Sequence, residues 1–393
     1  MNKVSIILPV FNSNDPILEI LSNINNQLYK PIEIIIIDSS INTDIQKKIK
    51  NFNSKITILY HWVPKAYPGH ARNIGVKLSK GDYIALVDSI TIPTKYWLHD
   101  YMKEIIKNNY NYKIGITEFF AKSIFQKLIY SASYGKLSFS TIPGSVFNKK
   151  YFNTTGGFSN KLRSSEDQHF FKKLSFVQKK YYKRGYLKYI NENDNFLYMI
   201  NKYFIYSCYT SFSNIQGFVK NTYLIIFLLV LPILFPYLKA VFPSFFLNNS
   251  SFFSIIYYSL LYIISYNFLT IIFTEKKNIF LSIKFFSTIV LIFITFIVIN
   301  WNKLFADWIQ SSIFYIPHIT KLYFALIILF SIFLRGLVLP LLRNVENNFI
   351  FPFNWIKIGL LTLVFDITKS PAYIFGAIIF PFVHLYHYIN RKN

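Results

Sequence analysis

The chain has 393 residues, of which 53% are hydrophobic and only 15% are charged. Soluble domains carry about 25% charged residues, so this composition excludes a disordered chain and indicates a membrane component. The single cysteine, Cys208, excludes an intramolecular disulfide and a metal cage built from cysteines. Lysine and arginine outnumber aspartate and glutamate by 42 to 18, which gives a formal net charge of +24.

This positive charge suits anionic lipid head groups or anionic substrates. A nucleic-acid partner is not expected, because the basic residues are scattered and no nucleic-acid-binding motif is present. Part of the excess can also reflect genome composition, since the chain is rich in Lys, Asn, Ile, Phe and Tyr, residues with AT-rich codons.

Short apolar runs alternate with amphipathic stretches up to about residue 190. Strands are expected at residues 4–11, 32–38, 56–62, 82–88 and 113–120, and helices at 16–28, 44–51, 70–78 and 96–108. Runs rich in β-branched residues that alternate with helices are typical of a parallel sheet covered on both faces. Such sheets bind ligands at the carboxyl ends of their strands, and the pattern therefore predicts an α/β fold with a site at that edge.

Four runs of about 20 apolar residues follow Asn221, each long enough to cross a bilayer. They are residues 223–242, 252–273, 279–299 and 320–342. The tail at 356–388 predicts one long kinked span, a re-entrant hairpin, or an interfacial helix followed by a span. Arg335, Asp366 and Lys369 are charges in or beside these runs, and they either line a groove for lipid phosphate or snorkel to the interface.

Positive residues gather in two loops between the apolar runs, at Lys276, Lys277 and Arg343. The positive-inside rule places these loops and the first 220 residues in the cytoplasm, so we expect an integral protein of a bacterial inner membrane. The predicted organisation has an α/β domain at 1–195, an interfacial amphipathic or linker segment at 196–221, and a transmembrane domain of four to six membrane segments at 222–393.

Polar residues also fall where the predicted sheet would bind ligands. Asp38 ends the second strand, where a carboxylate can accept hydrogen bonds from a base or a ribose, or simply cap a turn. Arg72 and Asn73 open a predicted helix after Gly69, a place suited to phosphate. Asp88 ends the fourth strand, where it can hold a divalent cation, although Arg72 and Asp88 could instead merely pair with each other.

A further cluster lies in the segment GGFSNKLRSSEDQHFFKKL, residues 156–174. Gly156 and Gly157 predict a flexible turn. Glu166 and Asp167 start the next predicted helix, whose dipole favours carboxylates. They form either an ordinary charge pair at a helix N-terminus or a general base beside an acceptor hydroxyl.

Together these segments resemble the family-2 glycosyltransferases of the GT-A fold. VSIILPVFN is similar to that family's first strand, IEIIIIDSS to its second, ARNIGVKLSKGDYIALVDS to its most recognisable segment, and GGFSNKLRSSED to its acceptor-side loop. The four occur in order and cover roughly residues 3–190. The resemblance implies a nucleotide-sugar-binding domain with a mostly parallel central sheet, followed by an all-α transmembrane domain.

The resemblance also implies roles for individual residues in a single inverting displacement. Asp167 would be the catalytic base, and Gly157 and Glu166 would lie on the acceptor side. The donor nucleotide sugar would be bound by Pro9, Asp38, Arg72, Asn73 and Asp88, and Asp88 would also hold Mg²⁺ or Mn²⁺.

One position departs from the family pattern. The metal motif of the family is usually Asp-x-Asp, whereas Ile90 stands here in place of the second aspartate. Another residue could then supply the second metal ligand, the metal could bind weakly, or the reaction could proceed without a tightly held metal. A protein without activity is a fourth alternative. His61, His70 and His169 are candidate replacement ligands by residue type alone.

Membrane-bound members of the family are either processive polysaccharide synthases or transferases that act on lipid carriers. The Gln-x-x-Arg-Trp motif usual in processive synthases is not found in the nearest candidate segment, residues 178–182. We therefore expect transfer to a lipid-linked acceptor in surface polysaccharide or glycolipid synthesis, with the basic run 179–188 holding the acceptor pyrophosphate or membrane lipids. A processive synthase and a non-catalytic nucleotide-sugar-binding membrane protein are the alternatives.

Overall fold

The computed structural model describes residues 2–11, 16–134, 138–174, 184–190, 195–210, 297–298 and 300–389. The chain forms two compact units, Met1–Ile215 and Gln216–Asn393, which are described separately. Three segments with predictions lie outside the described residues: the first three predicted membrane runs apart from residues 297–298, the end of the predicted linker at 211–221, and residues 179–183 of the basic run.

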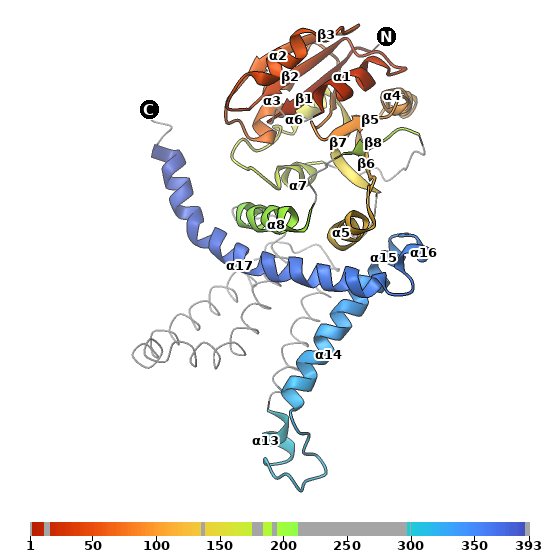
Figure 1. Cartoon of the computed structure of the whole chain (residues 1–393). Coiled ribbons are helices and arrows are strands. Elements are labelled where there is room, and N and C mark those ends of the chain that lie inside the picture. Colours follow the sequence, from red (N-terminus) through yellow and green to blue (C-terminus); the bar gives the residue numbers. More distant parts are fainter. Residues whose placement is uncertain are drawn as a thin grey trace. The chain divides into compact units, whose positions relative to one another are not determined.

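One eight-stranded sheet organises the first unit, with the strand order β3-β2-β1-β4-β7-β6-β8-β5 (Figure 1). The strands are β1 (Val4–Val10), β2 (Glu33–Asp38), β3 (Thr57–Trp62), β4 (Tyr83–Leu86), β5 (Thr91–Pro93), β6 (Tyr112–Phe119), β7 (Ser138–Asn148) and β8 (Leu187–Tyr189). The four strands from β3 to β4 pair in parallel, as predicted.

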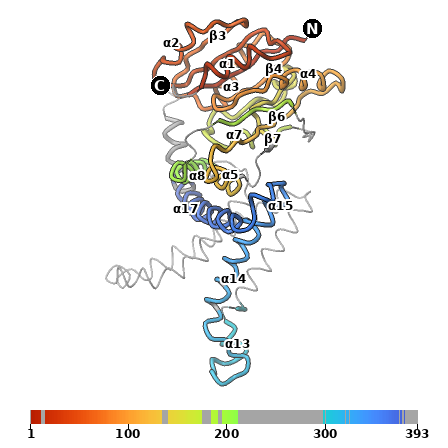
Figure 2. Tube along the Cα trace, turned by 45° about the vertical axis from the view of Figure 1, so that its right-hand side comes forward, coloured from red at the N-terminus to blue at the C-terminus, as the bar shows by residue number. Residues whose placement is uncertain are grey.

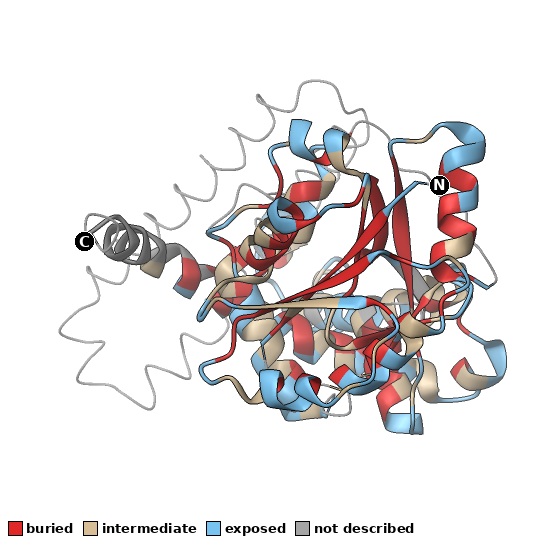
Figure 3. Cartoon of the chain, turned by 90° about the horizontal axis from the view of Figure 1, so that it is seen from above, coloured by how far each residue is buried: buried red, intermediate tan, exposed pale blue. Residues whose placement is uncertain are grey.

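Helices cover both faces of this parallel half. They are α1 (Ile17–Asn25), α2 (Asp44–Lys50), α3 (Pro68–Leu78) and α4 (Trp97–Asn108). In β2, Ile34 and Ile36 pack in the core cluster that contains α1, whereas Ile35 and Ile37 pack with Ala71 of α3. The strand is therefore buried on both sides, which explains its unbroken isoleucine run; the buried central strands are visible in Figure 3.

The other half of the sheet is mixed rather than parallel. β7 runs antiparallel to both of its neighbours, β4 and β6, and β5 runs antiparallel to β8. The sequence pattern does not predict β7, because Pro143, Gly144 and several hydroxyl residues interrupt its apolar positions. It nevertheless forms a strand, since Ile142, Val146 and Phe147 are fully buried in the core. The helices α5 (Ile124–Tyr134) and α6 (Lys149–Thr154) flank β7 in the chain.

The start of α3 decides where Arg72 and Asn73 lie. α3 begins at Pro68, two residues before the predicted start, because proline fits the first turn of a helix. Arg72 and Asn73 therefore lie in the second turn of α3 and do not open it, which corrects the predicted helix start. α7 (Glu166–Phe171) and α8 (Phe196–Thr210) complete the described part of the first unit.

The second unit is helical in its described part. Its helices are α13 (Trp301–Phe305), α14 (Ile319–Phe333), the π-helical turn η1 (Leu334–Val338), α15 (Leu339–Leu342), α16 (Asn347–Ile350) and α17 (Asn354–Ile389). Among the described residues, one helical segment, Lys321–Leu342, is long and apolar enough to cross a membrane, and it matches the predicted run at 320–342. α17 is a single 36-residue helix, so the tail is not a re-entrant hairpin (Figure 2).

α17 packs closely against η1 and the end of α14 at two glycines. A Cβ on Gly336 would lie 2.1 Å from the carbonyl oxygen of Trp355, and a Cβ on Gly359 would lie 2.6 Å from that of Ile332. Near this contact Arg335 forms an ion pair with Asp366, and Lys369 lies 3.5 Å from the same carboxylate. These charges therefore pair with one another, an arrangement that the sequence did not predict.

Candidate active site

Arg72 brings together three carboxylates that are far apart in the chain. Its guanidinium, which is almost fully buried, donates to Asp88 Oδ1 at 2.8 Å, to Glu166 Oε1 at 3.1 Å and to Asp167 Oδ1 at 3.1 Å. It also lies 5.3 Å from the ring centroid of Phe158. The predicted pairing of Arg72 with Asp88 is present, and the same arginine also binds the predicted base and its neighbour.

Asp88 is held in a tight turn after β4. Its backbone N–H donates to Thr91 Oγ1, and its carbonyl oxygen accepts from the backbone and side chain of Thr91. Ile90, at the position of the missing second aspartate, accepts a backbone hydrogen bond from Ile190 at 3.0 Å. The turn is therefore fixed by backbone contacts, and Asp88 alone of this triplet presents a carboxylate to the site.

Asn73 fastens the loop that precedes α7. Its amide donates to the carbonyl oxygen of Phe158 at 2.9 Å and to Asn160 Oδ1 at 2.8 Å, while its own oxygen accepts from the N–H of Phe158. Gly157 lies beside it with φ 65°, and a Cβ there would lie 2.6 Å from Asn73 Oδ1. The structure thus joins Asn73, predicted on the donor side, to Gly157, predicted on the acceptor side.

Asp38 lies at the carboxyl end of β2, beside Val10 of β1, and Pro9 lies one register position earlier, opposite Ile37. Tyr60 of β3 donates to Asp38 Oδ2 at 2.6 Å, and the N–H of Ser40 donates to Oδ1 at 2.9 Å. Burial and the hydrogen bond to Asp38 raise the pKa of Tyr60, so its hydroxyl stays a donor. Sequence analysis missed Tyr60, because it occupies an ordinary strand position on the neighbouring strand.

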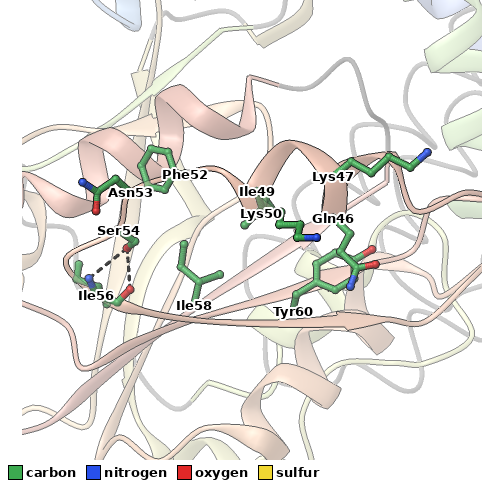
Figure 4. Close-up of a pocket in the computed structure, with 10 residues that line it drawn as sticks. All are labelled: Gln46, Lys47, Ile49, Lys50, Phe52, Asn53, Ser54, Ile56, Ile58 and Tyr60. Atoms are coloured by element: carbon green, nitrogen blue, oxygen red, sulfur yellow. Dashed lines mark hydrogen bonds between the residues drawn. The ribbon is translucent and has the colours of Figure 1, made fainter.

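A cavity of about 830 Å³ opens between α2 and β3. Figure 4 shows Phe52 and Ser54 at one end and Lys50 and Tyr60 at the other. Tyr60 therefore connects the cavity to Asp38. Arg72 and the three carboxylates that it binds do not line this cavity, so the cavity and the carboxylate cluster are separate.

The carboxylate cluster carries surplus negative charge, because Asp88, Glu166 and Asp167 surround the single guanidinium of Arg72. Burial raises the pKa of Asp167 to about 8, with a further contribution to this shift from Glu166 and Asp88 and an opposing one from Arg72. Burial also raises the pKa of Glu166. An additional cation near the cluster would favour the ionised form of Asp167.

The start of α7 is tied to α8. Ser165, which precedes the two carboxylates, has φ 65°, a backbone conformation that is costly for a residue other than glycine. Its hydroxyl lies 2.6 Å from Thr210 Oγ1, and the hydroxyl of Ser164 donates to the carbonyl oxygen of Tyr206 at 3.3 Å. These contacts hold the helix that carries the predicted base, and no motif in the sequence marked them.

Asp88 is the residue best suited to hold a metal ion here. Its side chain is 27% exposed, and Arg72 engages one of its oxygens. Mg²⁺ is commonly held by one or two carboxylates together with substrate phosphates, so a single Asp88 fits a metal that binds with the donor. His61 on β3, His70 on α3 and His169 on α7 do not join Asp88 in any metal-binding group of three among the residues that the structure describes.

Comparison with known proteins agrees with this geometry. The model of glycosyl transferase family 2 matches residues 5–169, which contain all the predicted site residues. The Escherichia coli enzyme UDP-Glc:alpha-D-GlcNAc-diphosphoundecaprenol beta-1,3-glucosyltransferase WfaP is 40% identical over 101 residues, covering 25% of this chain and 38% of that protein. The Bacillus spizizenii poly(ribitol-phosphate) beta-glucosyltransferase is 36% identical over 92 residues, covering 22% of this chain and 14% of that protein.

Among solved structures, S. aureus TarS in complex with UDP-GlcNAc has a TM-score of 0.38 and 18% identity, covering 55% of this chain and 67% of that one. The chain matches well under half the length of both curated relatives. The match to the glycosyl transferase family 2 model lies within the first unit, the unit that contains the α/β sheet.

Proposed function

We propose that this protein is a membrane-bound inverting glycosyltransferase that moves a sugar from a nucleotide-sugar donor to a lipid-linked acceptor. The product would belong to a surface polysaccharide or glycolipid. The observation that carries the proposal is the cluster in which Arg72 joins Asp88 to the Glu166–Asp167 pair. An inverting transfer needs one base near the donor diphosphate, and this cluster supplies a base and a diphosphate-side carboxylate within reach of one cation.

In this mechanism Asp167 accepts the proton of the acceptor hydroxyl as its oxygen attacks the anomeric carbon. The bond from that carbon to the diphosphate breaks, and the nucleoside diphosphate leaves with the electron pair. Arg72 holds Asp167 in place through the hydrogen bond at 3.1 Å and keeps positive charge beside the leaving group. Asp38, oriented by Tyr60, binds the nucleoside.

Asp88 would hold a Mg²⁺ or Mn²⁺ ion, which would neutralise the donor diphosphate when it is bound. The ion would bind together with the donor, because Ile90 removes the second carboxylate of the usual motif. We therefore propose a metal requirement that is met only at higher metal concentrations than a site with two carboxylates needs.

Two observations support a lipid-linked acceptor and a membrane location. The E. coli relative is named for an acceptor linked to diphosphoundecaprenol. The segment Lys321–Leu342 of this chain is long and apolar enough to cross a membrane. The charge distribution of the loops favours a cytoplasmic catalytic domain.

The test is release of nucleoside diphosphate by the full chain purified in detergent. UDP-, GDP- and dTDP-sugars are offered with or without an extract of bacterial polyprenyl-linked lipids, and with Mn²⁺, Mg²⁺ or EDTA. We expect release that requires the lipid extract and falls by at least about 10³-fold in Asp167→Asn.

Asp44→Asn is the matched control, because Asp44 lies at the start of α2 with its side chain 42% exposed and, among the described residues, forms an ion pair with Lys47. Equal release by wild type and Asp167→Asn would contradict the proposed base. Full activity in EDTA would show that the reaction proceeds without a metal.

A further inference from the structure

A cluster of one arginine and two tyrosines lies beside the start of α7, on the side of α8. The guanidinium of Arg163 lies 5.9 Å from the ring centroid of Tyr209 in α8. The edge of one ring packs on the face of the other between Tyr209 and Tyr67, with centroids 6.5 Å apart and planes at 71°. Tyr67 is the residue immediately before α3, so the segments that carry Arg72 and Asp167 also build this cluster.

The cluster is joined to the catalytic carboxylates through the backbone. Arg163 lies three residues before Glu166, and the intervening Ser164 and Ser165 are hydrogen-bonded to α8. Burial raises the pKa of Tyr206, one helical turn before Thr210, and Glu166 and Arg163 lie close enough to act on the same hydroxyl with opposite effects. An acceptor that presents its hydroxyl to Asp167 from this side would therefore pass Arg163.

The charge of Arg163 is available to a ligand. Its side chain is exposed, and no carboxylate pairs with it in the described part of the chain, whereas Arg72 binds three carboxylates. An arginine stacked on an aromatic ring keeps the N–H edge of its guanidinium open, and that edge matches two oxygens of a phosphate. The surface next to Arg163 thus offers a cation and two aromatic rings, which suit a phosphate and the apolar face of a sugar.

The neighbouring carboxylates explain why a cation is needed here. Asp88, Glu166 and Asp167 outnumber the single guanidinium of Arg72, and in the ionised form that transfer requires they repel a phosphate-bearing acceptor. We propose that Arg163, with Tyr67 and Tyr209, forms a subsite for the phosphate group of the acceptor. This inference rests on the proposed function, since it names the chemistry of the acceptor as a sugar joined to a lipid through a diphosphate.

The test measures binding, so it does not depend on sugar transfer. The full chain in detergent is titrated with two probes, GlcNAc linked to dodecanol through a diphosphate and GlcNAc linked to dodecanol directly. UDP, GDP and dTDP are present in excess to fill the donor site. We expect wild type to bind the diphosphate probe more tightly than the directly linked probe. Arg163→Gln should weaken binding of the diphosphate probe by about tenfold, equivalent to about 1.4 kcal/mol, and should not change the affinity for the directly linked probe.

Lys107→Gln is the matched control, because it also removes one exposed positive charge and lies near the end of α4, outside the predicted site residues. It should leave both affinities unchanged. Arg163→Lys keeps the positive charge but loses the bidentate contact with phosphate. It should therefore weaken binding of the diphosphate probe by only about threefold.

The inference is overturned if wild type does not prefer the diphosphate probe, or if Arg163→Gln leaves both affinities unchanged or weakens them equally. Binding that depends on Arg163, combined with no nucleoside diphosphate release from any donor, would count against the proposed reaction and leave the subsite intact. Nucleoside diphosphate release without a preference for the diphosphate probe would support the proposed reaction and count against the subsite.

Discussion

We expect that replacing Asp167 by asparagine will stabilise the folded protein while it removes the catalytic base. Asparagine resembles the protonated carboxyl, and its oxygen can still accept the hydrogen bond from Arg72. The substitution therefore removes an unfavourable charge from the cluster without opening a cavity. A gain in stability with a loss of activity is the pattern of a residue that is kept for function.

The magnitude follows from the pKa of Asp167, which rises from its ordinary value of 3.8 to about 8 in the folded chain. The folded state thus holds the proton more tightly than the unfolded state does, and stability falls as the pH rises from about 4 towards 8. At pH 7 this raised pKa corresponds to a loss of about 4 kcal/mol in the free energy of unfolding, before any allowance for solvent. Because the side chain is 34% exposed, water screens part of this cost, and about 1–2 kcal/mol remains.

Thermal unfolding of the full chain in detergent, followed by intrinsic fluorescence, measures this difference. Asp167→Asn should melt about 2–8 °C above wild type near pH 8 and about level with it near pH 4. Asp44→Asn, an exposed aspartate on α2, should show no gap that grows with pH. A variant that is less stable at every pH, or a gap that does not widen with pH, would refute the reasoning.

The same proton controls the pH dependence of transfer. Asp167 must be ionised to accept a proton, so kcat/KM should increase with pH through the region near 8. Added Mg²⁺ or Mn²⁺ should move this increase to lower pH, because a cation favours the ionised carboxylate. The measurement is a pH profile of nucleoside diphosphate release at low donor concentration. An acid limb near the ordinary value of 3.8 without added metal would contradict the assignment.

Two further predictions concern packing. Gly157→Ala should raise the KM for the acceptor by about tenfold, because the added Cβ would lie 2.6 Å from Asn73 Oδ1. Gly156→Ala is the control, since Gly156 also has a positive φ but an added Cβ there has no atom within 4 Å, and it should leave that KM unchanged. Equal effects in the two variants would count against a positioning role for the Asn73 contact. Lys113→Met should destabilise the first unit by about 3–5 kcal/mol in thermal unfolding, since it leaves Glu104 buried without its ion-pair partner. Replacing both residues with apolar ones should recover most of that loss, and a double variant as unstable as the single one would contradict this view.

The sequence predicts the parallel half of the sheet well because burial there leaves a simple pattern. β2 is apolar on both faces, so its isoleucine run appears as a single unbroken block. β7 is different, because Pro143 and Gly144 interrupt it and its core residues are spaced irregularly. Its place between β4 and β6 depends on pairing with distant strands, which one sequence does not show.

The candidate site likewise contains residues that the sequence suggests and residues that only the structure reveals. Asp38, Asp88 and Asp167 could be named as candidates from the sequence, because strand ends and a helix start are where sheet proteins place ligand-binding carboxylates, and their roles stay predictions. Tyr60 and Arg163 could not, because their roles depend on contacts with residues far along the chain.

The ion pair between Arg335 and Asp366 has an evolutionary consequence. Arg335 is acceptable beside apolar helices because Asp366 neutralises it, whereas Asp366 also has Lys369 at 3.5 Å. Loss of Asp366 is therefore the more harmful change until Arg335 also changes. Descendants of this gene should carry both charges, exchanged charges or two uncharged residues, and the two positions should vary together across the family tree.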